Sequence, residues 1–141
     1  MDQDEQLAVW GSFLRAGAEV VGQLDDELMR QQGIPLSWYE VLLHLDHSPE
    51  RRVRMQDLAA MVLLSKSGLT RLIDRMEKAG LVTRQSCPSD RRGTFAALTE
   101  EGQLRFRSSA QIHLNGVRTH FVERLGEHRL ADLRCMLELL L

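Results

Sequence analysis

Several patterns that mark particular classes of protein are missing from this sequence of 141 residues. No run approaches 18 uninterrupted apolar residues, so we expect no transmembrane helix and no membrane partner. The amino-terminal segment MDQDEQ is acidic and no apolar segment follows it, which argues against a secretory signal. Cys87 and Cys135 are too few for a disulfide framework, which favours a reducing cytoplasm as the compartment.

Proline and aromatic residues are also scarce. The chain has three prolines, 5% of its residues are aromatic and β-branched residues are few, which favours an α-rich fold with a core of Leu, Val, Ala and Met. With 43% hydrophobic and 27% charged residues, the composition is that of an ordinary globular protein. The length fits one domain, so we expect residues 1–141 to form a single one.

Motifs that carry catalysis are absent as well. The sequence has no phosphate-cradling glycine loop, no Gly-x-Ser-x-Gly and no His-Glu-x-x-His, so we predict a protein that is not an enzyme and needs no cofactor. None of the five histidines has another four residues away, the spacing of helical zinc sites. We therefore predict no metal site, although His44 and His47, three residues apart, leave metal sensing open as an alternative.

Charge is distributed unevenly along the chain, whose formal net charge is −2. Residues 1–50 contain ten acids and two bases, a net −8, and residues 51–92 contain ten bases and four acids, a net +6. The remaining residues balance at six of each. Because clustered Lys and Arg side chains release counterions from phosphates, the basic middle predicts a polyanion-binding centre.

The first half of the chain has the pattern of helices. Apolar spacing predicts a long helix at residues 5–31, ended by Gly33 and Pro35. Ser37 is expected to cap a second helix, with Glu40 three residues later completing a capping box. Short helices are predicted at about 55–62 and from a Ser65 cap to residue 79, and their tight join is typical of a helix-turn-helix.

A hairpin and further helices follow. Residues 81–98 contain two short extended stretches around the turn-rich tip CPSDRR, which predicts a β-hairpin. Thr99 then caps a long helix that Gly126 interrupts, and residues 127–141 form a final helix. The first and last helices carry more apolar surface than the small module between them could cover, which predicts a helical dimer interface.

The middle of the sequence also carries a family resemblance. LTRLIDRMEKAGLV (69–82), DRR (90–92) and LTEEG (98–102), in this order and spacing, resemble the MarR family of bacterial transcription regulators. Length and helix order agree more loosely over the whole chain. The resemblance implies a homodimer that binds a pseudo-palindromic operator in double-stranded DNA, most commonly as a repressor.

Residue types in the basic middle suit DNA binding. A helix N-terminus offers unpaired amides and a positive dipole to phosphate, and short hydroxyl and basic side chains there can reach base edges in the major groove. The family pattern Asp-x-Arg implies that Arg92 enters the minor groove. Arg91 is adjacent and is a candidate phosphate contact, whereas anionic Asp90 is expected to orient the arginine by a charge-assisted hydrogen bond. The predicted DNA-binding residues are Ser37, Gln56, Ser65, Lys66, Ser67, Thr70, Arg71, Arg75, Arg91 and Arg92.

Two kinds of signal input are candidates. Many relatives release DNA when a small molecule binds between the dimer helices and the winged module, although aromatic residues at helical spacing are also typical of a core. Cys87 has three arginines nearby in sequence and is a candidate redox site, whereas Cys135 on an apolar helix is expected to be inert. The residues that could line a cleft for an aromatic or anionic effector are Trp10, Phe13, Leu14, Arg15, Trp38, Tyr39 and Leu42.

These observations predict a mainly α fold with a small β-hairpin wing. We expect a winged helix-turn-helix at about 36–99 and a helical dimerisation region at about 1–33 and 100–141. The predicted function is a cytoplasmic, ligand-responsive repressor that binds DNA as a homodimer. The alternatives are a thiol- or metal-responsive regulator of the same fold, and a winged-helix module that binds protein instead of DNA.

Overall fold

A computed structural model gives the arrangement of the chain and describes the side chains of residues 1–89 and 93–141. The fold is mainly helical with a small antiparallel sheet, as predicted. The elements in chain order are α1 (Gln3–Gln32), α2 (Leu36–Asp46), the 3-10 turn η1 (Pro49–Arg51), β1 (Arg52–Arg54), α3 (Met55–Met61), α4 (Lys66–Lys78), β2 (Val82–Cys87), β3 (Asp90–Leu98), α5 (Glu100–Val117), the π-helical turn η2 (Arg118–Val122), α6 (Glu123–Leu125) and α7 (Glu127–Glu138).

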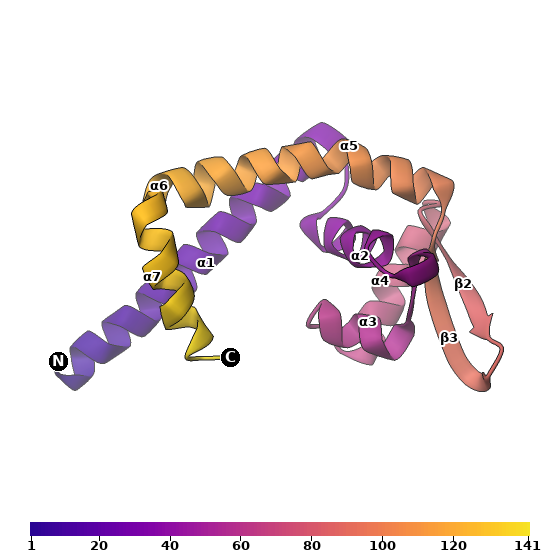
Figure 1. Ribbon diagram of the computed structural model, residues 1–141, viewed down its shortest axis with the longest axis horizontal. Coiled ribbons are helices and arrows are strands. Elements are labelled where there is room, and N and C mark those ends of the chain that lie inside the picture. Colours follow the sequence, from indigo (N-terminus) through magenta and orange to yellow (C-terminus); the bar gives the residue numbers. More distant parts are fainter.

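The elements divide between a module and an arm (Figure 1). The module contains α2, α3, α4 and the sheet. The arm contains α6, α7, η2 and the greater part of α1, and both chain termini lie in it. Helix α5 runs from the module into the arm and packs against α1. Among the described residues, no helix combines the length and the apolar character that crossing a bilayer requires.

The start of α2 differs from the predicted capping box. Pro35 is the N-cap residue, and exposed Ser37 lies inside the first turn, where it caps nothing. The Leu36 backbone N–H, one of the amides left over at this helix end, instead donates to Oδ1 of Asp25 at 2.7 Å. A carboxylate from α1 thus replaces the local cap that the sequence pattern indicated, and it ties α2 to α1.

Helices α3 and α4 form the predicted helix-turn-helix. Ser65 caps α4 by accepting a hydrogen bond from the Gly68 N–H at 3.1 Å. At the other end Gly80 adopts a φ of 76°, and the Leu81 N–H donates to the Met76 carbonyl at 3.0 Å. This is a Schellman ending, in which a glycine in the left-handed region reverses the chain and satisfies a carbonyl left over by the helix.

The wing sheet has three strands in the order β1-β3-β2, all antiparallel. The β2–β3 hairpin was predicted, whereas β1 was missed because three residues, Arg-Val-Arg, give almost no periodic signal. Val53 is buried beneath the sheet, and the guanidinium groups of Arg52 and Arg54 lie 4.6 and 5.7 Å from the ring centroid of Phe95 on β3. Cation–π contacts therefore accompany the β1–β3 pairing.

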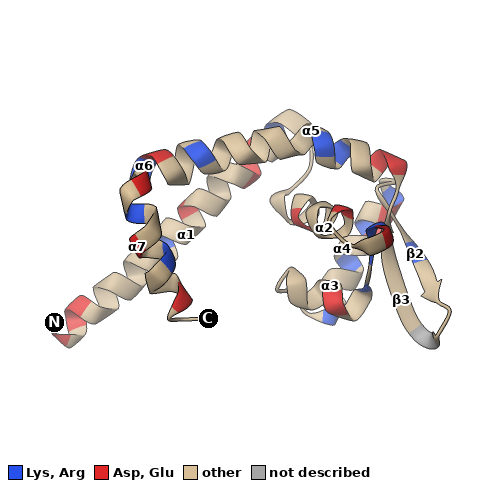
Figure 2. Ribbon diagram, viewed as in Figure 1, with Lys and Arg blue, Asp and Glu red and all other residues tan. Residues whose placement is uncertain are grey.

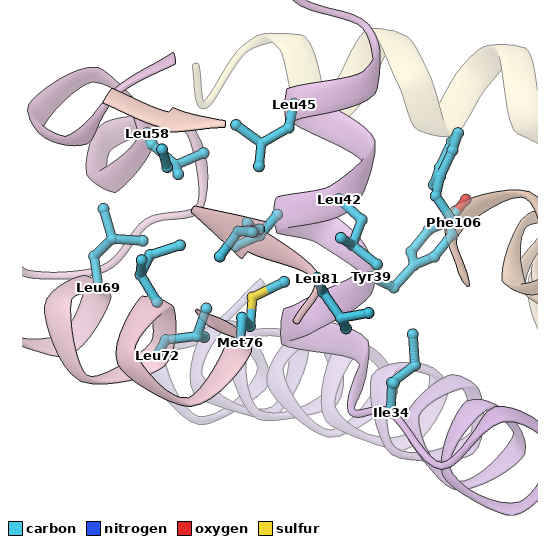
Figure 3. Close-up of a cluster of buried hydrophobic side chains, with 14 of the residues drawn as sticks. Ile34, Tyr39, Leu42, Leu45, Leu58, Leu69, Leu72, Met76, Leu81 and Phe106 are labelled. Atoms are coloured by element: carbon cyan, nitrogen blue, oxygen red, sulfur yellow. The ribbon is translucent and has the colours of Figure 1, made fainter. Parts of the chain in front are cut away.

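The apolar core lies in the module (Figure 3). Leu42 and Leu45 of α2 occupy its centre, with Tyr39 and Phe106 toward α5 and Leu69 toward α4. Burial of each such side chain contributes about 1.5–3 kcal/mol, so the module accounts for most of the hydrophobic stabilisation within one chain. The side chains with essentially no exposed surface are Leu28, Ile34, Val41, Leu42, Leu45, Leu58, Leu69, Ile73, Met76 and Val82.

The ends of α4, β2 and α5 meet in one joint, which we define as Gly80, Leu81, Thr99 and Gly102. The Thr99 N–H donates to the Leu81 carbonyl at 3.2 Å, and its hydroxyl donates to the Gly80 carbonyl at 2.7 Å. The same hydroxyl accepts from the Gly102 N–H at 3.0 Å, which confirms Thr99 as the cap of α5. A Cβ on Gly102 would overlap the Leu81 carbonyl oxygen, so the joint requires glycine there.

The sequence predicts one regular helix between Thr99 and Gly126. In the structure this helix changes to a π-helical turn, η2, after α5. This turn places His120 Nε2 2.6 Å from Glu27 Oε1 on α1. Glu27 can come this close because Gly116 has no side chain: a Cβ there would lie 2.6 Å from the other Glu27 oxygen. The π-helical turn and the glycine together join α5 to α1.

Gly102 offers a test of the joint. Gly102→Ala is expected to lower the free energy of unfolding by about 3 kcal/mol, because backbone atoms rather than a flexible side chain oppose the added methyl group. Thermal or urea unfolding followed by circular dichroism would measure it. Gly22→Ala is the control: nothing lies within 4 Å of its Cβ position, and alanine in a helix interior should stabilise by about 0.5–1 kcal/mol. Equal effects of the two substitutions would contradict the joint.

His113 on α5 provides a pH prediction. Its ring centroid lies 4.5 Å from that of Tyr39, and burial lowers the pKa of His113 below its usual 6.5. The unfolded chain therefore takes up this proton at a higher pH than the folded chain does. Stability is present above about pH 6.5 and is lost as the pH falls from there toward the lowered pKa. We expect His113→Gln to flatten this acid-side loss in unfolding titrations, and His128→Gln, at an exposed site, to leave it unchanged.

Candidate nucleic-acid interface

Helix α4 has two chemically distinct faces. Leu69, Leu72, Ile73 and Met76, at the three- and four-residue spacing of an apolar helix face, are buried in the core of the module. The opposite face is exposed and brings together six of the ten predicted DNA-binding residues. These six are Ser65, Lys66, Ser67, Thr70, Arg71 and Arg75.

The polar groups at the start of α4 are partly engaged with the helix itself. Ser65 accepts from Gly68 as the cap, and its hydroxyl lies 3.3 Å from that of Ser67. The Thr70 hydroxyl donates to the Lys66 carbonyl at 2.9 Å, which leaves its lone pairs for an outside donor. The Lys66 and Arg71 side chains are exposed cations beside a helix N-terminus, an arrangement that attracts phosphate.

A cleft of about 390 Å³ lies between α4, the start of α3 and the base of the wing. It joins Gln56, Lys66 and Thr70, all predicted DNA contacts, to Arg54 and Arg84, which sequence reasoning did not select. Two of the cationic side chains around this open cleft, Arg54 and Lys66, suit the phosphate backbone. The complete lining is Arg54, Met55, Gln56, Lys66, Leu69, Thr70, Arg84, Gly93 and Thr94.

Arg84 differs from the other cations because its charge is compensated. Its guanidinium donates to Asp74 Oδ1 at 2.6 Å and to Glu77 Oε1 at 3.0 Å. Both carboxylates have basic neighbours in sequence on α4, but the structure pairs them with Arg84 on β2. The motif Gly-Leu-Val-Thr-Arg ends at Arg84, but no local pattern shows that a residue on β2 folds back to pair with the preceding helix.

The other predicted DNA-binding residues lie away from the exposed face of α4 or outside the residues whose side chains the structure describes. Ser37 is exposed in the first turn of α2 and does not line the cleft. Arg91 and Arg92, predicted to bind DNA, and Asp90, predicted to orient the wing arginine, fall outside the residues whose side chains the structure describes.

Within one chain, the residues of the predicted effector pocket do not lie close together. Tyr39 and Leu42 belong to the core, Trp38 packs beside it, and the rings of Tyr39 and Phe106 stack with centroids 5.7 Å apart. Trp10 lies 18 residues before the buried Leu28, about 27 Å along the axis of α1. The remaining members, Phe13, Leu14 and Arg15, lie near Trp10 on the exposed part of α1.

The structure also shows the surroundings of the cysteines and histidines that were candidates for redox or metal sensing. Cys87 is 5% exposed and its sulfur lies 3.2 Å from the Ser89 hydroxyl, whereas Cys135 is exposed on α7. Arg84, one of the arginines near Cys87 in sequence, is engaged by two carboxylates. His47 packs edge-on against Phe106, and within the described part of the chain no three His, Cys, Asp or Glu side chains form a group able to hold a metal ion.

The arm exposes apolar side chains that the module cannot reach. Acidic residues mark the tip of α1, and an uncharged stretch follows them (Figure 2). Leu140 and Leu141 extend the same apolar character beyond α7. On α1 the exposed large apolar residues are Leu7, Val9, Trp10, Phe13, Leu14, Val21 and Met29.

Comparison with known proteins places these features in context. Residues 32–93 match the model of the MarR family. The structure of AbsC, a MarR family transcriptional regulator from Streptomyces coelicolor, superposes with a TM-score of 0.91 at 39% identity, covering 99% of this chain and 93% of that one. Sco3205 from the same organism, a MarR family regulator solved in complex with DNA, gives 0.91 at 37% identity and covers 99% and 87%.

A third structure bears on ligand binding. CouR from Rhodococcus jostii RHA1, solved bound to p-coumaroyl-CoA, superposes with a TM-score of 0.79 at 27% identity, covering 92% of this chain and 89% of that one. Alignments with curated transcriptional regulators from Bacillus subtilis and Escherichia coli are shorter. The chain spans 40% to 65% of the length of these relatives.

Proposed function

Because the chain belongs to the MarR family of winged helix-turn-helix transcriptional regulators, a family that binds DNA and is not enzymatic, we propose that it acts as a homodimeric, ligand-responsive repressor. The observation that carries this proposal is the exposed face of α4, where hydroxyl and cationic side chains surround a helix N-terminus. A regulator of this kind acts on the chromosome, and we place it in the cytoplasm.

In the proposed complex, α4 lies in the major groove. Lys66, Ser67, Arg71 and Arg75 face the DNA, and the cleft between α4 and the wing base follows the phosphate backbone. Arg92 enters the minor groove, as the Asp-x-Arg pattern implies, with Asp90 orienting it and Arg91 on phosphate. Residues 36–99 form the DNA-binding module in this proposal, with Gln56 and Ser37 as further phosphate contacts.

A second copy of the chain is proposed to cover the arm, formed by residues 1–33 and 100–141. The exposed apolar stripe on α1 and the apolar C-terminus support this assignment, since solvated monomers rarely expose such a continuous surface. Two α4 helices related by a twofold axis would bind half-sites about 10 bp apart on one side of the DNA. A dimer bound over a promoter excludes other proteins, which is the physical basis of repression.

The proposed effector is an aromatic or anionic small molecule. The relative CouR was solved with p-coumaroyl-CoA, an anionic thioester that carries an aromatic group. In this chain, the buried atoms Ser109 Oγ and His113 Nδ1 on α5 have no hydrogen-bond partner among the described residues, and the centroid of the His113 ring lies 4.5 Å from that of Tyr39. Polar atoms in such surroundings would gain from a polar ligand group. The cavity of about 160 Å³ between α1 and the C-terminal part of α5 is not lined by Ser109 or His113 and is smaller than a typical ligand site, so such a ligand would require the helices to separate.

Arg71 tests the DNA contact. Arg71→Gln is expected to weaken binding to duplex DNA and to reduce the slope of log K against log salt by about 1, because one phosphate-neutralising cation is lost. The probe is a duplex selected from a random pool by the wild-type protein, titrated by fluorescence anisotropy at several salt concentrations. Arg134→Gln, the same change on exposed α7, is the control and should keep the wild-type slope. If wild type shows no steep salt dependence, a protein-binding module becomes the better explanation.

The arm tests the dimer. The double substitution Leu7→Glu and Leu14→Glu places two charges on one face of α1 and is expected to convert a dimer of two 16.1 kDa chains into monomer. Sedimentation equilibrium would measure the mass. Leu63→Glu, at an exposed leucine between α3 and α4 and outside the proposed dimerisation region, should leave the dimer intact. A dimer that survives the double substitution would contradict the proposed interface.

A further inference from the structure

The recognition helix α4 and strand β2 of the wing are joined by more than their connecting turn. Arg84 on β2 donates through its guanidinium to the Thr70 carbonyl at 3.3 Å, to Asp74 at 2.6 Å and to Glu77 at 3.0 Å. Its backbone N–H also donates to the second Glu77 oxygen at 3.0 Å. Four hydrogen bonds from one residue therefore attach the strand to two turns of the helix.

This contact is unlike a phosphate-binding site. Arg84 with Asp74 and Glu77 carries a net charge of −1, so the group repels phosphate although it contains an arginine. The Arg84 side chain is 28% exposed, less than either carboxylate, and its planar fork satisfies both acids at once. A single cation engaged in this way holds structure in place rather than contacting the DNA backbone.

We propose that Arg84 is a positioning residue that fixes the wing relative to the recognition helix. The inference rests on the DNA-binding function proposed above, because α4 and the wing would enter neighbouring grooves of the same duplex. β2 pairs with β3, which leads to the wing tip, so the orientation of β2 against α4 determines where the tip lies. Without the clamp formed by Arg84, Asp74 and Glu77, the wing would be held to α4 only at the joint, and the added freedom of β2 against the helix would have to be lost on binding, which would cost affinity.

Glu77 gives the sharpest test because simple electrostatics predicts the opposite result. Removing a negative charge beside a DNA-binding surface should strengthen binding, and removing one near the C-terminus of α4 should also favour the helix dipole. The clamp predicts instead that Glu77→Ala weakens binding to the selected duplex by roughly tenfold, a change of about 1.4 kcal/mol. Asp57→Ala removes a carboxylate that is exposed in the first turn of α3, and it should leave affinity unchanged or slightly higher.

Arg84 variants complete the experiment. Arg84→Gln and Arg84→Lys should both weaken binding and keep the wild-type salt slope, since no phosphate contact is lost and a lysine cannot reproduce the fork. In the double variant Arg84→Gln with Glu77→Ala, the two losses should not add. Circular dichroism establishes that each variant is folded before titration.

Two measurements distinguish a failure of the proposed clamp from a failure of the proposed DNA-binding function. Absence of wild-type binding to any duplex would refute the DNA-binding proposal. Amide hydrogen exchange needs no DNA: Glu77→Ala should accelerate exchange at the Arg84 amide and along β2, while the buried residues of α4 keep their protection. The clamp would be overturned if Glu77→Ala strengthens binding, if Arg84→Gln lowers the salt slope by about 1, or if exchange along β2 is unchanged.

Discussion

The close approach of α5 to the turn after α4 is the constraint on which the other arrangements depend. At this joint the Leu81 carbonyl accepts from Thr99 and lies directly against Gly102. The recognition helix ends there, the wing begins one residue later, and the helix that enters the arm starts beside both. The directions of three elements are thus fixed by a few backbone atoms. No side chain can substitute for this contact, because it depends on the absence of a Cβ at Gly102.

How strongly the cations of residues 51–92 attract phosphate depends on which side chains they pair with, and not on their number alone. Arg71 and Arg84 contribute equally to the net charge of residues 51–92, yet Arg71 is exposed and Arg84 is held by two carboxylates. Asp74 and Glu77 lie on the same helix as the cations proposed to bind DNA, and Arg84 compensates them so that they do not oppose phosphate in full. The acidic residues of α4 thus pair with the wing strand β2, and the exposed cations of α4 define the surface proposed to face DNA.

The sequence predicts those parts of the fold whose stabilising partners lie within a few residues along the chain. The Ser65 and Thr99 caps and the glycine after α4 each follow from residues within four positions, and the buried stripe of α4 follows from its period. The predictions failed where a distant group supplies the partner. Asp25 replaces the expected cap at Ser37, β1 exists because β3 pairs with it, and Arg84 reaches back to α4. The predicted effector-pocket residues are separated within one chain, since helical spacing cannot reveal how far along α1 the core extends.

The path from arm to module passes through α5, which belongs to both. Its first turn is fixed at the joint, its middle packs Phe106 against Tyr39, and its end is tied to α1 through His120 and Glu27. A helix of 18 residues transmits a displacement at one end to the other because its hydrogen-bonded backbone bends little over that length. A change in how two arms pack would therefore move Gly102 against Leu81, and with it the end of α4. The unpartnered polar atoms of Ser109 and His113 lie between those two points. A ligand group that binds them would act on a helix that connects the proposed dimer interface to the proposed DNA-binding surface.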